Sequence, residues 1–318
     1  MGNFVSLLKV IASEKVITIW GHGLPDGDCY GCQIGLREII KENFPDKEVY
    51  AVGSGVPSLF ERISPMDNVD EEKIKESLAI LVDVSCLRRV EDQRVTLAKR
   101  FLKFDHHDPN RIGESFPYPD FYVDRHKIAC AEIIENFATQ NHLKISKIAA
   151  EALYLGILTD SGCFRFYGTN QRTCDAVKRL IKLGVEPISI RQIVYYEDER
   201  TKAFHAYLCS RVQRYKEVTY VYLKPEDYLS RGMNYEEAGS MVNCIETVSS
   251  PRIYCLFTED GKGAVRGELR SDKGYPVQPT ATRFHGGGHL FAAGTETYSF
   301  EESMKVVEEL SKVKPVLL

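Results

Sequence analysis

Short apolar runs alternate with longer amphipathic segments along the first 184 residues of the chain. The short runs are rich in β-branched residues and predict buried strands at residues 16–20, 48–52, 78–84 and 101–104. The longer segments repeat an apolar residue every three or four positions. They predict helices at residues 3–13, 30–42, 90–99, 128–137, 146–158 and 170–183. Such alternation is typical of an α/β domain with a parallel sheet.

The pattern changes after residue 187. Residues 188–212 predict a long polar helical connector, and the region beyond it mixes strands and helices. Strands are expected at residues 218–223, 253–258, 264–269 and 295–299, and helices at residues 235–246 and 301–310. We therefore expect an N-terminal parallel-sheet domain (1–187), a helical connector (188–214) and a smaller α+β domain (215–318).

Acidic and histidine residues gather where these predicted elements end. They are His22, Asp26, Asp28, Asp83, His106 and Asp160. A single Asp at a strand end is commonly a helix N-cap or turn residue, so each position alone has a simpler explanation. The whole set within one α/β domain instead predicts convergence at one edge of the sheet.

Converging carboxylates repel one another unless cations balance them. Two divalent ions would offset this repulsion, and oxygen and imidazole ligands without thiolate favour manganese, magnesium or iron over a structural zinc. The spacing His22-x3-Asp26-x-Asp28 suits two ions about 3.5–4 Å apart with one acid bridging them, an arrangement used for attack on phosphorus.

Five ordered motifs resemble the DHH phosphoesterase superfamily and its associated C-terminal domain. They are His22-x-x-Pro25-Asp26-Gly27-Asp28, Val82-Asp83-Val84-Ser85, Asp105-His106-His107, Thr159-Asp160-Ser161-Gly162, and His285-Gly286-Gly287-Gly288-His289 with Ala292-Ala293-Gly294 after it. Within the superfamily the chain most resembles bacterial nanoRNases, which also remove phosphate from 3′-phosphoadenosine 5′-phosphate (pAp). It departs from the family pattern at Leu24, where Asn is frequent, and at Cys32, where Ser is common.

The resemblance implies a role for each motif residue. One metal would be held by His22, Asp26 and Asp83, and a second by Asp28, Asp83, His106 and Asp160, with Asp83 bridging. Family members usually work with manganese. His107 would face the scissile phosphate or help protonate the leaving oxygen, and Asp105 would orient a histidine, so the catalytic set is His107, Asp105 and Asp83.

The glycine-rich segment predicts a substrate-binding site in the C-terminal domain. Three successive glycines can form a nest of backbone N–H groups that binds an anion. The expected binding residues are Arg270, Ser271, His285, Gly286, Gly287, Gly288 and His289. By resemblance Arg270, Ser271 and His289 are the best-matched positions, and Arg266 and Arg283 lie nearby in the sequence.

Composition and net charge narrow the possible classes of protein and its location in the cell. The net charge of −4 excludes a generic basic nucleic-acid coat protein, and no run of about 20 apolar residues predicts a membrane span. Nine scattered cysteines without an export signal favour reduced thiols in a cytoplasmic protein. Cys29 and Cys32 are expected to pack at a helix start. No stable protein partner is evident, although the resemblance implies a homodimer.

These patterns predict a two-metal phosphodiesterase or phosphatase that hydrolyses short oligonucleotides and pAp. Within the enzyme class, hydrolysis of linear or cyclic dinucleotides and of polyphosphate remain alternatives. A non-catalytic nucleotide sensor or a metal-stabilised interaction protein is a further alternative, and neither would release phosphate.

Overall fold

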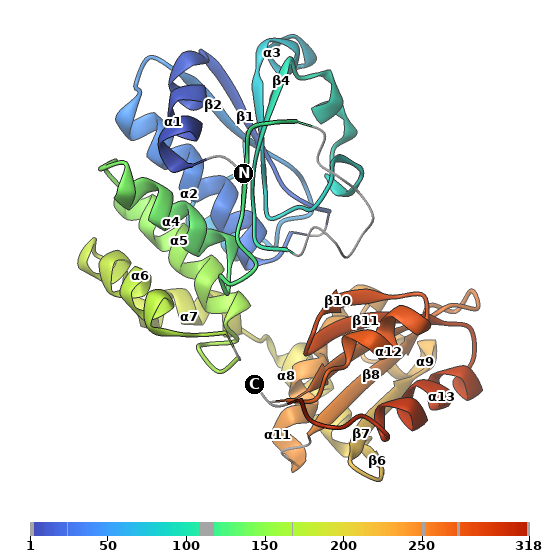
Figure 1. The fold of residues 1–318 in the computed structure, drawn as a ribbon. Helices are drawn as coiled ribbons and strands as arrows, with labels where there is room; N and C mark the ends of the chain where they lie inside the picture. The colour runs from blue at the N-terminus through green and yellow to red at the C-terminus, as the bar shows by residue number, and fades with distance from the viewer. Residues whose placement is uncertain are drawn as a thin grey trace. The chain divides into compact units, whose positions relative to one another are not determined.

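Two compact units make up the chain, Met1–Tyr196 and Glu197–Leu318. The computed structural model describes residues 3–23, 25–107, 118–166, 168–249, 252–271 and 274–316 (Figure 1). Leu24, one of the two departures from the family pattern, lies outside the described residues.

The first unit is built on a five-stranded sheet in which every neighbouring pair of strands is parallel. Its order is β2-β1-β3-β4-β5. The strands are β1 (Val16–Trp20), β2 (Glu48–Val52), β3 (Leu78–Val82), β4 (Arg100–Asp105) and β5 (Phe121–Val123). This topology confirms the parallel α/β class predicted from the sequence.

Both faces of this sheet are buried, and alternate residues of a strand enter different cores. On β3, Ile80 and Val82 pack beneath the long helices, whereas Leu81 packs with short helical turns on the other face. The long helices are α1 (Phe4–Ser13), α2 (Gly27–Asn43), α4 (Cys130–Gln140), α5 (Lys147–Asp160), α6 (Gln171–Lys182) and α7 (Pro187–Tyr195). The opposite face carries α3 (Glu71–Glu76) and the 3-10 turn η3 (Gln93–Leu97); the turns η1 (Phe60–Arg62) and η2 (Leu87–Arg89) join other elements.

The prediction of a helix at residues 90–99 is wrong, because this segment forms only the 3-10 turn η3. Val90 pairs with His22 in an isolated β-bridge and keeps an extended backbone, with φ −62° and ψ 135°. The Asp92 carboxylate then accepts a hydrogen bond from Arg94 N at 2.9 Å, which favours a turn. The tertiary bridge therefore overrides the helical spacing of the apolar residues.

Glycines allow α2 and α5 to pack unusually closely. Gly27, Gly31 and Gly35 recur every fourth residue on α2, so they share one face of that helix. A Cβ added to Gly31 would lie 2.3 Å from the carbonyl oxygen of Ala152, and one on Gly27 would lie 2.5 Å from the Thr159 side chain. This contact fixes the N-terminal end of α2, with its two acids, against the C-terminal end of α5.

The second unit contains a mixed six-stranded sheet of order β10-β11-β9-β8-β7-β6. Its strands are β6 (Gln213–Tyr215), β7 (Val218–Leu223), β8 (Ile253–Glu259), β9 (Val265–Ser271), β10 (Gly287–His289) and β11 (Ala292–Thr297). β7 and β8 are parallel, and the other neighbouring strands are antiparallel. The unit confirms the predicted α+β class, although β11 starts three residues before the expected strand.

Helices cover both faces of this second sheet. One core joins the sheet to α12 (Gln278–Arg283) and α13 (Phe300–Leu310). The other core involves α8 (Glu199–Ser210), α9 (Pro225–Leu229), α10 (Tyr235–Ser240) and the 3-10 turn η5 (Met241–Ile245), which α11 (Glu246–Ser249) follows. α8 belongs to this unit, whereas α7 belongs to the first.

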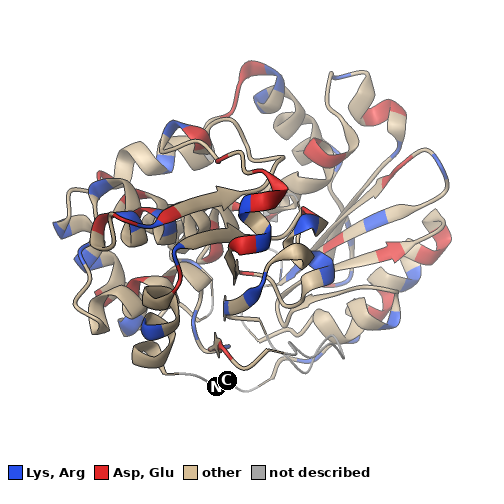
Figure 2. Ribbon diagram, turned by 90° about the horizontal axis from the view of Figure 1, so that it is seen from above, with Lys and Arg blue, Asp and Glu red and all other residues tan. Residues whose placement is uncertain are grey.

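Basic and acidic residues are interspersed along the helices and strands of each unit (Figure 2). This mixing agrees with a net charge of only −4. Among the described residues, we find no helix that is both long and apolar enough to cross a membrane.

The close helix contact can be tested by replacing Gly31 and Gly35 with alanine. Gly31→Ala should lower the free energy of unfolding by about 2–3 kcal/mol, because its Cβ meets the backbone of α5. Gly35→Ala is the matched control: its Cβ would meet the movable Leu153 side chain at 2.6 Å, and alanine favours the helix. Urea denaturation of both variants measures the difference, and an equal or reversed order would contradict this packing.

Candidate active site

His22 leaves the end of β1 and points one ring nitrogen at two acids. Its Nδ1 lies 2.9 Å from the Gly23 carbonyl oxygen, so Nδ1 carries the hydrogen and donates it. Nε2 lies 3.8 Å from Asp26 Oδ1 and 3.6 Å from Asp83 Oδ2. Partial burial would lower the pKa of His22, but Asp83 raises it to about 12. Nε2 therefore points toward two carboxylates, as the nitrogen of a metal-binding histidine would.

Asp26 combines the capping role and the candidate ligand role that the sequence left open. It is the N-cap of α2, and its Oδ1 accepts hydrogen bonds from Asp28 N at 3.0 Å and Cys29 N at 2.9 Å. Its side chain nevertheless remains 55% exposed. Capping fixes the orientation of the carboxylate and leaves it accessible to a cation.

Asp28 is fully buried and acts as the N-terminal cap of a different helix. Its carboxylate accepts hydrogen bonds from Cys130 N at 2.6 Å and Ala131 N at 2.9 Å, at the start of α4. The N-cap residue of α4 is Ala129, which has no side-chain acceptor of its own. Burial, and then the charge of Asp83, raise the pKa of Asp28 to about 7. The Asp28 carboxylate thus links α2 to α4, and the positive charge near it does not offset its burial and the charge of Asp83.

Asp83 sits at the centre of the cluster in a strained backbone conformation. Its φ is +52°, in the left-handed region, and its N–H donates to Phe104 O at 3.1 Å. The side chain is 3% exposed, and within the described residues Oδ1 makes no hydrogen bond of good geometry, although His106 Nε2 lies 3.3 Å away. Burial would raise the pKa of Asp83, but the imidazoles of His106 and His22 lower it. An ionised, buried oxygen in this position fits a cation ligand.

His106 faces three carboxylates. Its Nδ1 lies 3.2 Å from the Lys127 carbonyl oxygen, which makes Nε2 the nitrogen that faces the acids. Nε2 lies 3.3 Å from Asp83 Oδ1 and 3.4 Å from Asp160 Oδ2 at the end of α5; it is also 3.9 Å from Asp28 Oδ2. Burial would lower the pKa of His106, but these acids raise it well above its usual value. Burial and the charge of Asp28 likewise raise the pKa of Asp160.

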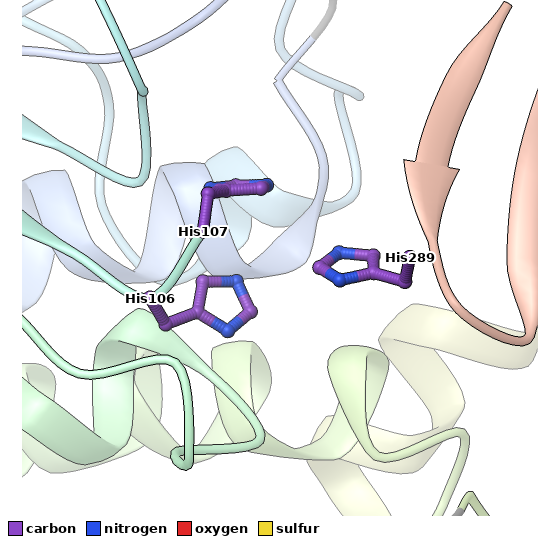
Figure 3. A group of neighbouring side chains, drawn as sticks. All are labelled: His106, His107 and His289. Atoms are coloured by element: carbon purple, nitrogen blue, oxygen red, sulfur yellow. The ribbon is translucent and has the colours of Figure 1, made fainter. Parts of the chain in front are cut away.

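The rings of His106 and His107 are neighbours after β4, but the Nδ1 atoms of the two histidines contact different partners (Figure 3). Its Nδ1 donates to Asp105 Oδ1 at 2.8 Å, and its side chain is 34% exposed. Burial would raise the pKa of Asp105, but the hydrogen bond from His107 lowers it. Lys103 Nζ, also buried, lies 3.3 Å from Asp105 Oδ2 and donates to Ser85 O at 3.0 Å. A fixed chain of contacts therefore orients the more exposed histidine.

Of the candidate metal-binding groups, two consist only of predicted ligands, and both include Asp83. His22, Asp26 and Asp83 bring ligand atoms within 4.8 Å of one another, and so do Asp28, Asp83 and His106. Asp160 joins the second group through its distance to His106 Nε2. The nitrogen and oxygen donors, the excess of acids and the Asp83 Oδ1 atom without a hydrogen bond all fit divalent metal ions. The six residues predicted as ligands are thus brought together.

In the second unit, the register of the sheet places two predicted binding residues in one row. His289 on β10 pairs with Ala292 on β11, and Ala292 pairs with Arg270 on β9. Directly paired residues of antiparallel strands project from the same face, so His289 and Arg270 flank a methyl group on one face. His289 is also drawn in Figure 3.

Two of the three successive glycines have a structural reason that is separate from the expected anion-binding nest. A Cβ on Gly286 would lie 1.8 Å from Gly294 O, and one on Gly288 would lie 2.7 Å from Ala292 O. Gly286 N donates to Ala281 O at 2.9 Å, and residues 287–289 form β10. The Gly286 N–H is therefore already paired within this unit, which weakens the support for its part in an anion-binding nest. By contrast, a Cβ on Gly287 would meet no described atom within 4 Å.

The other predicted binding residues have local partners. Ser271 Oγ donates to Tyr275 O at 2.6 Å, and the His285 ring lies 6.3 Å from the Tyr298 ring, toward the opposite end of β11 from His289. Arg283 forms an ion pair with Glu309 at 2.9 Å. The structure therefore groups Arg270 with His289 and places His285 apart from them.

Several groups that contact the predicted site residues were not predicted from the sequence. Lys103 had a local signal, because it is a charged residue inside an otherwise apolar strand. The Cys130 and Ala131 N–H groups that bind Asp28 had none, since backbone donors about 100 residues away leave no pattern. Cys29 and Cys32 are buried free thiols in the first turns of α2, as expected.

His106 and His107 make different contacts, and this difference predicts different metal contents for variants of the two residues. His106→Gln should lose one of two bound metal ions, because Nε2 faces three acids. His107→Gln is the matched control and should keep both, since its Nδ1 is bound to Asp105. Metal content after dialysis measures this, and equal losses in the two variants would refute the division.

Metal binding should release protons. Metal ions must displace the hydrogens that the raised pKa values favour on His22, His106 and Asp160, and below about pH 7 also the one on Asp28. More protons should therefore be released at pH 6 than at pH 8, and the apparent metal affinity should rise with pH. Titration calorimetry of manganese in buffers of different ionisation enthalpy counts the protons. Equal release at both pH values would contradict the raised pKa of Asp28.

Comparison with known proteins places this geometry in a family. Residues 16–157 match the DHH family, N-terminal domain, and residues 216–313 match the DHHA1 domain. The probable bifunctional oligoribonuclease and PAP phosphatase NrnA of Streptococcus mutans is 30% identical, across 98% of this chain and 99% of that protein. The bifunctional oligoribonuclease and PAP phosphatase NrnA of Bacillus subtilis is 29% identical, across 96% of each chain.

A solved structure agrees on the fold. The exopolyphosphatase-related protein from Bacteroides fragilis superposes with a TM-score of 0.85 at 23% identity, covering 97% of this chain and 95% of that one. The sequence relatives span nearly the whole chain, and both domains match in order. The chain therefore belongs to the DHH family of phosphoesterases.

Proposed function

We propose that the protein is a two-metal phosphoesterase that hydrolyses short oligonucleotides and also pAp. The observation that carries this proposal is the pair of ligand groups that share the buried Asp83 carboxylate. The names of the Streptococcus mutans and Bacillus subtilis relatives support the substrate class. The absence of thiolate from the donor set favours manganese, magnesium or iron over a structural zinc, and the family resemblance favours manganese among them. We also propose a cytoplasmic location, in agreement with the free cysteines.

When bound, the two metal ions would activate the attacking water and polarise the phosphoryl oxygens. The residues of the chain then have separate tasks. His22, Asp26 and Asp83 would hold one ion, and Asp28, Asp83, His106 and Asp160 would hold the other. Asp28 and Asp26 are held by helix N-termini, so the ligands are oriented before metal binds.

His107 would act on the substrate rather than on the metals. Its Nδ1–H is held by the ionised Asp105 carboxylate, which makes Nε2 the ring atom to face the phosphate or the leaving oxygen. Lys103, on the far side of Asp105, keeps that carboxylate in place. This arrangement would let His107 stabilise developing charge or deliver a proton without reorienting.

The second unit would bind the remainder of the nucleotide. We assign Arg270 and His289 to this task, because they share one row on the same face of the sheet. Gly287 would let the substrate approach the backbone, since its missing side chain has no internal explanation. Ser271, Gly286, Gly288 and His285 stay predicted binding residues with weaker support, because each has a local structural role.

The alternatives make different predictions for the same protein. A hydrolase of linear or cyclic dinucleotides would act faster on a linear di-adenylate or a cyclic dinucleotide than on longer oligonucleotides. An exopolyphosphatase would release phosphate from polyphosphate. A nucleotide sensor would bind these compounds and release no phosphate.

A substrate panel with manganese separates these activities. The panel contains pAp, oligonucleotides of two to five residues, a cyclic dinucleotide and polyphosphate. We expect the highest kcat/KM on the short oligonucleotides and measurable phosphate release from pAp. Asp83→Ala should reduce both activities by at least about a thousandfold, because both ligand groups lose their shared oxygen.

A matched variant controls for folding. Asp67→Ala removes a carboxylate that pairs with Arg37 outside the ligand groups, so it should keep metal content and turnover. Wild-type turnover by Asp83→Ala, or no hydrolysis of any oligonucleotide by the wild-type protein, would refute the proposed function.

A further inference from the structure

Three charged residues alternate along β9 of the second unit and project from one face of the sheet. Glu268 lies between the two arginines. Its Oε1 accepts hydrogen bonds from Arg266 at 2.6–2.7 Å, and its Oε2 lies 3.1 Å from Arg270 NH1. The Glu268 side chain is 12% exposed and that of Arg270 is 22% exposed. One carboxylate thus holds the guanidinium proposed for substrate binding.

The register places Glu268 beside the proposed binding row. Glu268 pairs with Gly294, and Gly294 pairs with Gly287. On this face the neighbouring row runs from His289 through Ala292 to Arg270. Side chains no larger than a methyl group therefore lie between Glu268 and Arg270 on one side and β10 on the other. A bound group resting on this strip would lie near the Glu268 carboxylate.

The charges around Glu268 cancel. Arg266 also pairs with Glu236, at 2.7 Å, so within this network of ion pairs two guanidinium groups contact two carboxylates, and Glu296 on β11 lies opposite Arg266 in the register. Arg270 therefore lacks the excess positive charge that would favour a highly charged anion. Because Glu268 and Arg270 are largely buried, solvent screens this balance incompletely.

We propose that Glu268 determines specificity by substrate charge, favouring a phosphodiester over a terminal phosphomonoester at Arg270. This inference rests on the proposed function. A phosphodiester carries one negative charge, whereas a phosphomonoester carries about −1.5 to −2 near pH 7. Repulsion from Glu268 grows with the charge of the ligand, and it therefore weakens binding of the phosphomonoester more. Arg270 still donates hydrogen bonds to either group.

Two substrates that differ by one methyl group test this role: the 5′-phosphorylated dinucleotide pApA, whose terminal phosphate is a phosphomonoester, and its 5′-methyl ester, whose terminal phosphate is a phosphodiester. Glu268→Gln keeps the shape of the side chain and removes its charge. We expect KM to fall about tenfold for pApA and about threefold for the methyl ester, because the removed repulsion scales with ligand charge. The kcat values should stay within about twofold, since the substitution lies outside the metal ligands. The change in the KM ratio should shrink at high salt.

Glu236→Gln is the matched control. It removes the same charge from the same cluster, but Glu236 contacts Arg266 and not Arg270 among the contacts of the described residues. Its KM ratio should therefore change by less than half as much as that of Glu268→Gln. Circular dichroism and thermal melting verify that both variants are folded.

The outcomes separate this inference from the proposed function. A wild-type protein that hydrolyses neither dinucleotide would refute the function itself. If the wild type is active, equal KM changes for pApA and its 5′-methyl ester in Glu268→Gln would overturn the charge role. Equal ratio changes in the two variants would overturn it as well. A larger KM decrease for pApA, specific to Glu268→Gln, would support it.

Discussion

Mutual repulsion among buried carboxylates is the constraint on which the first unit depends. Asp28 and Asp83 are buried, and His106 Nε2 lies within 3.9 Å of both and of Asp160. The fold lowers the cost of these charges with two helix N-termini and two imidazoles. It leaves Asp83 Oδ1 without a well-formed hydrogen bond among the described residues. The remaining imbalance is what two metal ions would neutralise.

The packing of α2 against α5 fixes the positions of three of these acids relative to one another. Asp26 and Asp28 belong to the start of α2, and Asp160 ends α5. Their separation depends on the glycines that let the helices touch, and Gly156 itself leaves room for Asp28: a Cβ there would lie 2.7 Å from Asp28 Oδ1. Packing far from solvent therefore sets the distances between ligands at the sheet edge.

The sequence predicted the parts of the fold that follow from local patterns. The parallel sheet, both domain classes and the clustering of the six candidate ligands could be predicted, because acids and histidines follow the ends of the apolar strands and of the helix before Asp160. The error at residues 90–99 arose because the Val90–His22 bridge lies outside any local window. The short strands β5, β6 and β10 were missed because three residues give too little periodicity, and two of the residues in β10 are glycines.

The two units balance charge by different means, and this difference bears on how substrate would be selected. In the first unit the excess charge is negative and bound metal ions would balance it, so the balance would change with pH and metal concentration. In the second unit Glu268 and Glu236 balance Arg266 and Arg270 through ion pairs within the chain. A preference for substrate charge is therefore best encoded in the second unit, where metal supply cannot alter it.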